Sequence, residues 1–273
     1  LAFGYLSSVT MIGIWEGMLS EMIETGTNLV TGQLQIHSPD YYPERSMYAT
    51  LGAREGIDVE ELLRLTRETP GIVAASPRVY GGGLVSSGTE TVAGMLVGVD
   101  MEREPDVTRL LSLPAEGRVP RAGEREILIG RGMADLLNVE PGDEVVLVAP
   151  AADGSLGNDL YRVSGVFSTG MATLDRSFGI LPIKSLQELM AMPENRIHEV
   201  AASVEDPWTV AALGDSLAAA LAGWGLDYPI SPRPWTVFRA ELAAYADLAG
   251  AVNGIIVGII FVMAVFGVAN TML

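Results

Sequence analysis

The sequence contains 273 residues, of which 17 are basic and 34 are acidic, giving a formal net charge of -17 at pH 7. This composition argues against a surface that binds nucleic acid or anionic lipid headgroups, because both partners require clustered basic residues. Cysteine is absent, which excludes disulfides, thiolate metal sites and thiol nucleophiles. The two histidines, His37 and His198, have no partner at metal-ligand spacing, so we interpret each as structural or exposed.

The N-terminal run carries no charged residue before Glu16. It is too short to cross a bilayer, and we expect residues 1–15 to be a truncated transmembrane helix that is longer in the intact protein. A signal-peptide core is the alternative, but the run has neither a basic leader nor a small-residue cleavage site. Residues 16–31 continue as a predicted stalk helix, in which Leu19 and Met22 lie on one apolar face.

Polar and apolar residues alternate over residues 33–37, which predicts a half-buried strand with Leu34 and Ile36 on its inner face. After a loop, the spacing of apolar residues predicts a helix over Val59–Glu68. Asp58 supplies the side chain expected at an N-cap, so the start of this helix is well marked.

Residues 72–100 are expected to hold strands that are broken by the glycine triplet at residues 81–83. The segment GGGLVSSG has the glycine content of a phosphate-binding loop but lacks the lysine and the following helix, so we interpret it as a hairpin. The segment GEREILIGRGMADLLNVEPGDEVVLVAP predicts a strand, a short helix, a tight turn and a strand, at Glu126–Ile129, Gly132–Leu137, Pro141–Asp143 and Glu144–Val148.

Strands are also predicted in LYRVSGVFSTG, SFGILPI and HEVAASVED, and helices in SLQELMAM and in the segment that opens at Pro207. The numerous Asp and Glu residues are scattered, at positions that we expect to face solvent. No pair of them suits acid–base chemistry, so we predict no catalytic, cofactor-binding or metal-binding residue. The elements predict an α+β domain over residues 32–234.

Residues 235–247 predict a second stalk helix, whose apolar stripe is expected to pack against the first stalk. The stripe consists of Phe238, Leu242, Tyr245 and Leu248. From Leu248 to Ala269 there are about 22 residues without charge, equivalent to about 33 Å of helix, which is enough to cross a bilayer core. A buried helix of a soluble domain is the alternative, but such helices seldom run so far without a polar face. We therefore predict a second truncated transmembrane helix at residues 248–273.

Small residues recur at every fourth position of this second membrane segment. Gly250, Gly254 and Gly258 form a row that would let another transmembrane helix approach closely. Asn253 is the one strongly polar residue in this part of the segment, and it is expected to form a hydrogen bond across that helix contact.

Four stretches resemble a known family, the permease subunits of ABC transporters of the MacB, FtsX and Lol types. They are GQLQIHSPDY, EREILIGRGMADLLNVEPGDEVVLVAP, YRVSGVFSTGMATLDRSFGILPIKSLQELM and FGVANTML. The GQLQIH and FSTGMATLD segments resemble most the lipoprotein-releasing branch, the LolC- and LolE-like permeases. The resemblance covers almost the whole chain, although no loop clearly matches the hook with which Lol permeases bind their carrier.

The resemblance implies a MacB-like periplasmic core with two subdomains, roughly residues 32–110 with 195–234, and residues 111–194. It also implies a permease in the bacterial inner membrane that dimerises with a second copy or a paralogue. ATP and Mg would bind to a separate cytoplasmic ATPase subunit, and this chain would bind no cofactor itself. Further expected partners are membrane lipid and a periplasmic lipoprotein carrier.

The function implied by the resemblance is the extraction of lipoproteins or other lipid-linked substrates from the inner membrane by mechanical transmission. Phe261, Met263 and Phe266 are candidate residues for contact with an acyl chain, with ordinary lipid-facing positions as the alternative. Two other functions remain open. One is a MacB-type efflux permease that works with an adaptor and an outer-membrane channel, and the other is an FtsX-like regulator of a cell-wall hydrolase.

Overall fold

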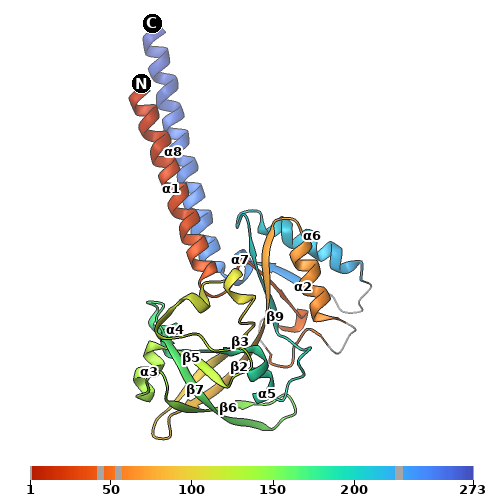
Figure 1. Cartoon of the computed structure of the whole chain (residues 1–273). Coiled ribbons are helices and arrows are strands. Elements are labelled where there is room, and N and C mark those ends of the chain that lie inside the picture. The colour runs from red at the N-terminus through yellow and green to blue at the C-terminus, as the bar shows by residue number, and fades with distance from the viewer. Residues whose placement is uncertain (1, 42–45, 53–56, 225–229, 273) are drawn as a thin grey trace. The chain divides into compact units, whose positions relative to one another are not determined.

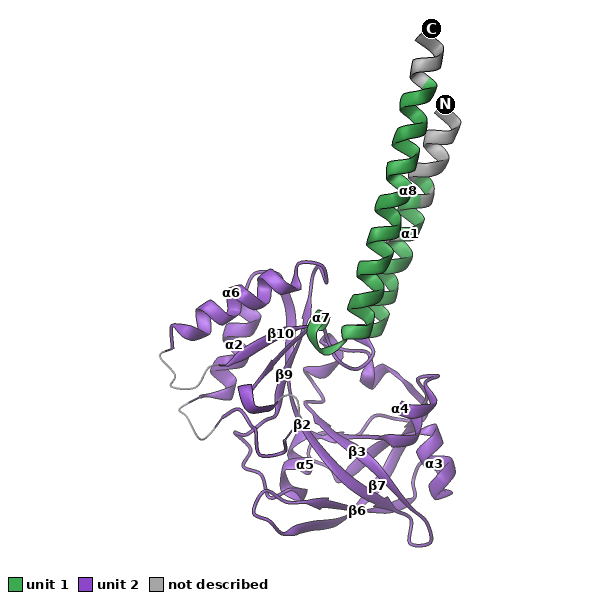
Figure 2. Cartoon of the chain, turned by 180° about the vertical axis from the view of Figure 1, so that it is seen from behind, with its two compact units in different colours: residues 1–27, 235–273 green, residues 28–234 purple. Residues whose placement is uncertain are grey.

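The computed structural model describes residues 2–41, 46–52, 57–224 and 230–272 (Figure 1). The chain divides into two compact units, a helical unit of residues 1–27 with 235–273 and a domain of residues 28–234 (Figure 2). The helical unit contains α1 (Ala2–Asn28, whose last residue belongs to the domain), α7 (Trp235–Phe238) and α8 (Ala240–Met272).

The helices α1 and α8 run antiparallel and side by side within the helical unit (Figures 1 and 2). Gly26 of α1 faces Leu242 of α8, and a Cβ atom built on Gly26 would lie 3.2 Å from Leu242 Cδ2. Ala246 and Ala249 of α8 are each only 5% exposed. Small residues at these positions allow the two helix backbones to approach closely.

Among the described residues, one helix is long and apolar enough to cross a membrane, the part of α8 from Ala240 to Gly267. It includes most of the membrane segment predicted at residues 248–273, and its most apolar 18-residue window is only 6% buried. Residues 2–15 fall in α1 and are helical, as expected, while residue 1 lies outside the described residues. A second flanking membrane helix is not confirmed there, so it stays a prediction.

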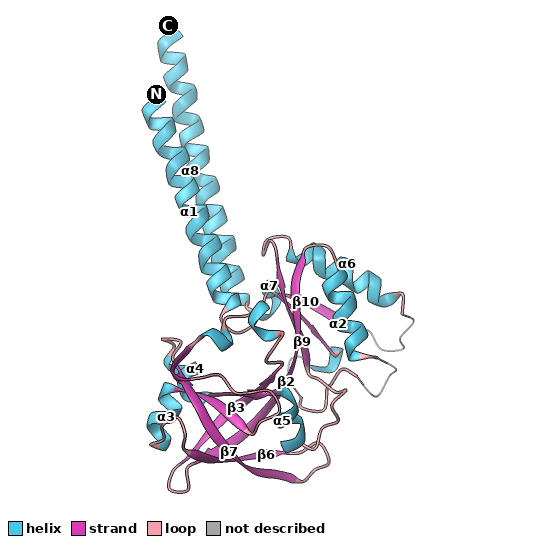
Figure 3. Cartoon of the chain, viewed as in Figure 1, coloured by secondary structure: helices cyan, strands magenta, loops and turns pink. Residues whose placement is uncertain are grey.

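Over its described residues, the domain is built on one ten-stranded sheet with five α-helices and three 3-10 helices (Figure 3). The strands are β1 (Leu34–His37), β2 (Ile72–Ser86), β3 (Thr91–Val99), β4 (Pro114–Gly117), β5 (Glu126–Gly130), β6 (Glu144–Pro150), β7 (Leu156–Phe167), β8 (Phe178–Pro182), β9 (Glu199–Val204) and β10 (Ser231–Pro234). The helices are η1 (Pro39–Tyr41), α2 (Val59–Glu68), η2 (Glu104–Asp106), η3 (Leu110–Ser112), α3 (Arg131–Leu137), α4 (Ala172–Ser177), α5 (Ile183–Leu189) and α6 (Val210–Ala222).

The strand order is β10-β1-β9-β2-β3-β8-β5-β7-β4, and β6 pairs with both β2 and β7. Two of the pairings, β3 with β8 and β5 with β7, are parallel and the others are antiparallel, which confirms a mixed α and β domain. Proline occurs in both outermost strands of this order, at Pro232 and Pro234 in β10 and at Pro114 in β4. One cluster of buried apolar side chains comprises Val97, Val99, Leu110, Leu111, Leu128, Phe167 and Ile180.

The strand β2 is continuous over 15 residues and passes through the glycine triplet. The predicted break at residues 81–83 is therefore wrong. These glycines serve close packing, because a Cβ on Gly81 would lie 2.7 Å from Met190 Sδ and one on Gly83 would lie 2.7 Å from the Val148 carbonyl oxygen. The following β2–β3 hairpin confirms the interpretation of GGGLVSSG.

The strand β2 also connects the two ends of the sheet. It pairs with β9 from Ile72 to Arg78 and with β3 from Arg78 to Ser86, so that Arg78 is the residue at which its pairing partner changes. The predicted boundaries of two subdomains stay a prediction, since one strand contributes to both parts.

Candidate functional site: the polar junction where α1 enters the domain

The connection from α1 to β1 is a tight turn in which few other side chains would fit. Asn28 is the last residue of α1 and the first residue of the domain. Gly32 has a φ of 72°, and a Cβ on it would lie 2.9 Å from the Ala202 carbonyl oxygen. The N–H of Gln33 donates to that same carbonyl oxygen at 2.9 Å. Glycine at residue 32 is thus required both by the backbone conformation and by the close approach of β9.

The strand β1 is buried along its whole length, so the prediction of a half-buried strand is wrong. Gln33 and Gln35 are 2% and 4% exposed, and both make hydrogen bonds. Gln33 Nε2 donates to Asn28 Oδ1, Gln33 Oε1 accepts from the N–H of Val204 at 3.3 Å, and Gln35 Nε2 donates to the Thr31 carbonyl at 3.0 Å. The polar face of β1 therefore faces a buried hydrogen-bond network and does not face solvent.

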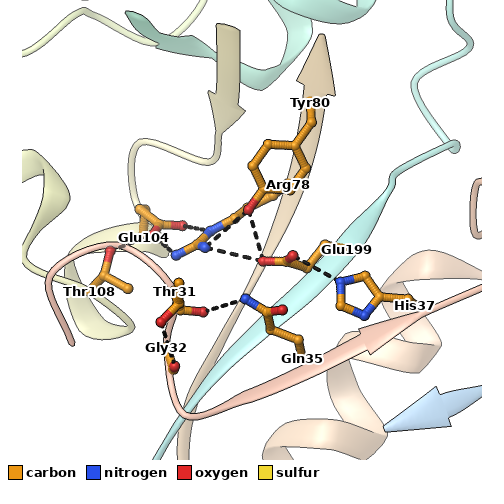
Figure 4. A network of polar contacts seen from close by, with 9 residues as sticks. All are labelled: Thr31, Gly32, Gln35, His37, Arg78, Tyr80, Glu104, Thr108 and Glu199. Atoms are coloured by element: carbon orange, nitrogen blue, oxygen red, sulfur yellow. Dashed lines mark hydrogen bonds and ion pairs between the residues drawn. The ribbon is translucent and has the colours of Figure 1, made fainter. Parts of the chain in front are cut away.

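The centre of this network is Arg78 on β2, which is 1% exposed (Figure 4). Its Nε and Nη2 donate to the two oxygens of Glu104 at 3.2 and 2.5 Å, and its Nη1 donates to Glu199 Oε1 at 3.1 Å. Burial alone lowers the pKa of the Arg78 guanidinium, but nearby negative groups, led by Glu104, outweigh this and hold that pKa well above its usual range. Arg78 is therefore a permanent cation between two buried carboxylates.

The carboxylate of Glu199, on β9, is held from three sides. It accepts hydrogen bonds from Arg78 and from the hydroxyl of Tyr80 at 3.0 Å, and its second oxygen lies 3.0 Å from His37 Nε2. Burial raises the pKa of Glu199, but the bond with His37 and the charge of Arg78 more than offset this and bring its pKa below the usual range. Burial and the Glu199 charge raise the pKa of Tyr80 well above its usual range. The ring of His37 also stacks on Tyr41, with centroids 4.7 Å apart.

The second histidine has a structural role as well. His198 Nδ1 accepts from the N–H of Tyr80 at 3.0 Å, and its Nε2 lies 3.0 Å from the Met47 carbonyl oxygen. This arrangement fits a neutral imidazole that carries its proton on Nε2. Burial lowers the pKa of His198, which favours the same neutral form.

A short segment connects this network to the end of α1. Thr108 Oγ1 donates to Glu104 Oε1 at 2.6 Å, and the N–H of Arg109 donates to the Asn28 carbonyl at 2.7 Å. An open pocket of about 220 Å³ lies within the domain, beside this segment. Its polar lining residues are Asn28, Gln33, Asp106, Thr108, Arg109 and Ser203.

The expectation that acidic residues face solvent is wrong for Glu104 and Glu199, which are 0% and 3% exposed. The sequence held one signal for this cluster, namely single charged residues, Arg78 and Glu199, within otherwise uncharged strands. Every side-chain nitrogen and oxygen of Arg78, Glu104 and Glu199 is bonded to another protein group, an arrangement suited to fixing the positions of strands. Among the described residues, no group of three His, Asp or Glu side chains is placed to hold a metal ion.

In the helical unit, the predicted stalk residues Leu19, Met22, Phe238 and Leu242 are partly buried. Tyr245 and Leu248 are 49% and 63% exposed, so their predicted place in the packing stripe is wrong. Ala246 and Ala249 are buried in their stead, because a close helix pair selects small residues over large apolar ones.

Most of the residues singled out in the membrane segment are exposed on α8. Gly250, Gly254 and Gly258 are exposed, and a Cβ atom added to any of them would meet nothing within 4 Å, while Asn253 is partly buried. The three candidate acyl-contact residues are among the most exposed apolar side chains described: Phe261 at 68%, Met263 at 64% and Phe266 at 70%. These positions leave the helix surface available to lipid or to another helix.

Comparison with known proteins gives consistent results. The family model described as the MacB-like periplasmic core domain matches residues 1–220. The lipoprotein-releasing system transmembrane protein LolC of Xylella fastidiosa is 24% identical over 98% of this chain and 65% of its own length. LolC of Neisseria meningitidis serogroup B is also 24% identical, over 86% of this chain and 55% of its own length. The chain thus spans less than two thirds of these relatives.

Two solved structures share the fold. The periplasmic region of MacB from Actinobacillus actinomycetemcomitans superposes with a TM-score of 0.53 at 13% identity, covering 82% of this chain and 98% of that one. The extracellular domain of the ABC-type transporter YknZ from Gram-positive bacteria gives a TM-score of 0.50 at 17% identity, covering 74% and 99%.

Proposed function

Because the chain belongs to the family of MacB-like periplasmic core domains, we propose that it is part of the permease subunit of an ATP-driven ABC transporter. The observation that carries the proposal is the exposed apolar stretch of α8, long enough to cross a bilayer, in a chain whose domain has the MacB-like fold. The permease lies in the bacterial inner membrane, and its central domain lies in the periplasm.

The substrate we propose is a lipoprotein or another lipid-linked molecule that the transporter extracts from the membrane. Support comes from the two LolC relatives, which carry the name of a lipoprotein-releasing system. Phe261, Met263 and Phe266 offer an exposed apolar surface on α8 that suits an acyl chain. Ordinary contact with bilayer lipid is the alternative role for these three side chains.

ATP and Mg bind, in this proposal, to a separate cytoplasmic ATPase subunit. This chain contributes motion, and a second copy or a paralogue completes the permease. The exposed row of Gly250, Gly254 and Gly258 lies open for such a partner helix, with Asn253 close by as a hydrogen-bonding group. A periplasmic carrier would then receive the released lipoprotein.

The proposed mechanism is the mechanical transmission of helix movement to the domain. A rigid connection is the physical requirement, since a slack one would absorb the displacement. Within the domain, the close packing of Gly32 against β9 and the buried hydrogen bonds of Gln33 support such a connection. The Arg78 network then fixes β2 to β9, so that movement at the junction is applied to the sheet as a whole.

The experiment is reconstitution of the full-length permease and its ATPase in proteoliposomes loaded with a lipoprotein. We expect release that depends on ATP and on an active ATPase, with an ATPase variant unable to hydrolyse ATP as the control. Absence of ATP-dependent release would contradict the lipoprotein assignment. ATP-dependent movement of a small amphiphile that needs an adaptor protein would instead favour the MacB-type efflux function, which the shared fold also allows.

A further inference from the structure

We infer that the segment from Glu104 to Arg109 is a latch that couples the end of α1 to the buried ion network and passes helix displacement into β2. This inference rests on the proposed function, because it assigns the step by which helix movement enters the domain. It adds a role for Thr108 and Arg109, which act as positioning residues.

At its first end the latch holds Asn28. The N–H of Arg109 donates to the Asn28 carbonyl at 2.7 Å, while the Asn28 side chain accepts from Gln33 Nε2. The backbone and the side chain of this one residue are therefore held by two segments that lie far apart in the sequence. A displacement of Asn28 therefore strains both of these bonds.

At its other end the latch is anchored in the core. Thr108, which is 2% exposed, donates from Oγ1 to Glu104 Oε1 at 2.6 Å, and Glu104 is bound to Arg78 by two hydrogen bonds. A buried carboxylate that loses a donor is poorly compensated, so this anchor resists breaking. The latch moves as a unit more easily than it detaches.

Between its ends the segment is braced by backbone hydrogen bonds. The N–H groups of Val107 and Thr108 both donate to the Glu104 carbonyl, at 3.0 and 2.9 Å, which closes a helical turn. Asp100 fixes the start of the segment, because its carbonyl accepts from the N–H of Glu104 at 2.9 Å.

The anchor point explains how the displacement is distributed. Arg78 is the residue at which β2 leaves β9 and begins to pair with β3, opposite Glu199 on one side and Val99 on the other. A force that reaches Arg78 through Glu104 thus acts on both parts of the sheet at once. An anchor farther along β2 would act on one part only.

The test uses the full-length permease with its ATPase and compares Thr108→Val with Thr66→Val. Both threonines are buried and donate one hydrogen bond, but Thr66 donates to the Leu62 carbonyl within α2, away from the latch. Two quantities are measured: hydrogen exchange at the Arg109 amide, and lipoprotein released per ATP hydrolysed.

We expect Thr108→Val to speed exchange at the Arg109 amide by about fivefold, the equivalent of one hydrogen bond. Release per ATP should fall by a similar factor while ATP hydrolysis continues. Thr66→Val should change neither quantity, and Thr108→Ser, which keeps the hydroxyl, should restore both.

Unchanged exchange at Arg109 in Thr108→Val would overturn the latch, and so would faster exchange with full coupling, since the segment would then only anchor the loop. These outcomes are separable from failure of the proposed function. If the wild-type transporter released no lipoprotein, the transport assignment would fall together with the coupling role, whereas the exchange comparison would still report on the anchor itself.

Discussion

Arg78 and Glu104 face each other through two hydrogen bonds, at 3.2 and 2.5 Å, and their side chains are 1% and 0% exposed. The pair joins a strand of the sheet to a loop that reaches the end of α1. A buried ion pair of this kind gives little net stability over an apolar pair of the same shape, but it defines relative position closely.

Removal of one partner from this pair should be strongly destabilising. Glu104→Gln leaves the Arg78 charge without its principal counterion, and we expect the free energy of unfolding to fall by about 3–5 kcal/mol. This free energy is measured by denaturant unfolding of the full chain in detergent. The control is Arg64→Gln, which breaks an exposed pair with Glu61 and Glu68 and should have no resolvable effect. Equal effects of the two variants would contradict a buried network.

Stability should fall on mild acidification because of His198. Its pKa in the folded state lies below the ordinary value of 6.5, so the unfolded chain takes up the proton first as the pH decreases. The loss of stability therefore begins as the pH falls through about 6.5 and continues down to the folded pKa. Glu199, whose pKa is also lowered, adds to the loss of stability only at lower pH, from about pH 4.5 downward.

The comparison that isolates this effect is His198→Gln against the wild type, with unfolding measured between about pH 7.5 and 5. The variant should lose overall stability, but its stability should depend less on pH across that range. An unchanged slope would mean that His198 is not held in its neutral form.

Gly32→Ala tests the rigidity of the turn after α1. The new Cβ would lie 2.9 Å from a backbone oxygen at a φ of 72°, and we expect a loss of about 1–3 kcal/mol in stability. Gly88→Ala is the matched control, since Gly88 has a φ of 93° but nothing within 4 Å. In thermal unfolding, the melting temperature of Gly32→Ala should be clearly lower than that of Gly88→Ala. A lower melting temperature for Gly88→Ala would mean that β9 moves to make room for the new Cβ.

Membrane insertion of α8 can be mapped with single cysteines, because residues 1–273 contain none. In native membranes, a water-soluble maleimide should label Asp247→Cys quickly and should label Phe261→Cys and Met263→Cys only after detergent is added. The three positions are all exposed in the chain itself, so a difference in labelling reports the bilayer. Rapid labelling at Phe261 in intact membranes would refute the span.

The glycine row of α8 gives a separate test of permease assembly. Gly254→Leu should weaken association of the permease with its partner copy, measured by cross-linking in the membrane, while the fold of the chain is retained because nothing lies within 4 Å of that position. Val252→Phe, which also adds bulk at an exposed position but on another face of α8, is the control. Equal cross-linking in both variants would remove the row from the interface.

Local signals allowed much of the fold to be predicted. The helix α2 begins and ends as expected, since Asp58 accepts from the N–H of Glu60 at 2.9 Å and so fixes its first turn. The turn at Pro141 and the flanking β5, α3 and β6 also match within one or two residues. Each of these elements is specified by residues close to it in sequence.

The polar junction could not be predicted in the same way. Alternation along β1 indicates two different faces, but it does not tell whether the polar face meets water or the side chains of Arg78 and Glu199, which come from distant strands. The prediction of the packing stripe on α8 was wrong for another reason. Hydrophobicity favoured Tyr245, whereas the close approach of Gly26 to Leu242 selects for size.

The prolines at the two margins of the sheet limit how other polypeptides can dock. Pro232 and Pro234 in β10 and Pro114 in β4 have no amide hydrogen to donate, so each margin lacks one or two of the donors that an added strand would use. Within the described residues, these margins therefore favour recognition of the domain through its exposed side chains over pairing between backbones.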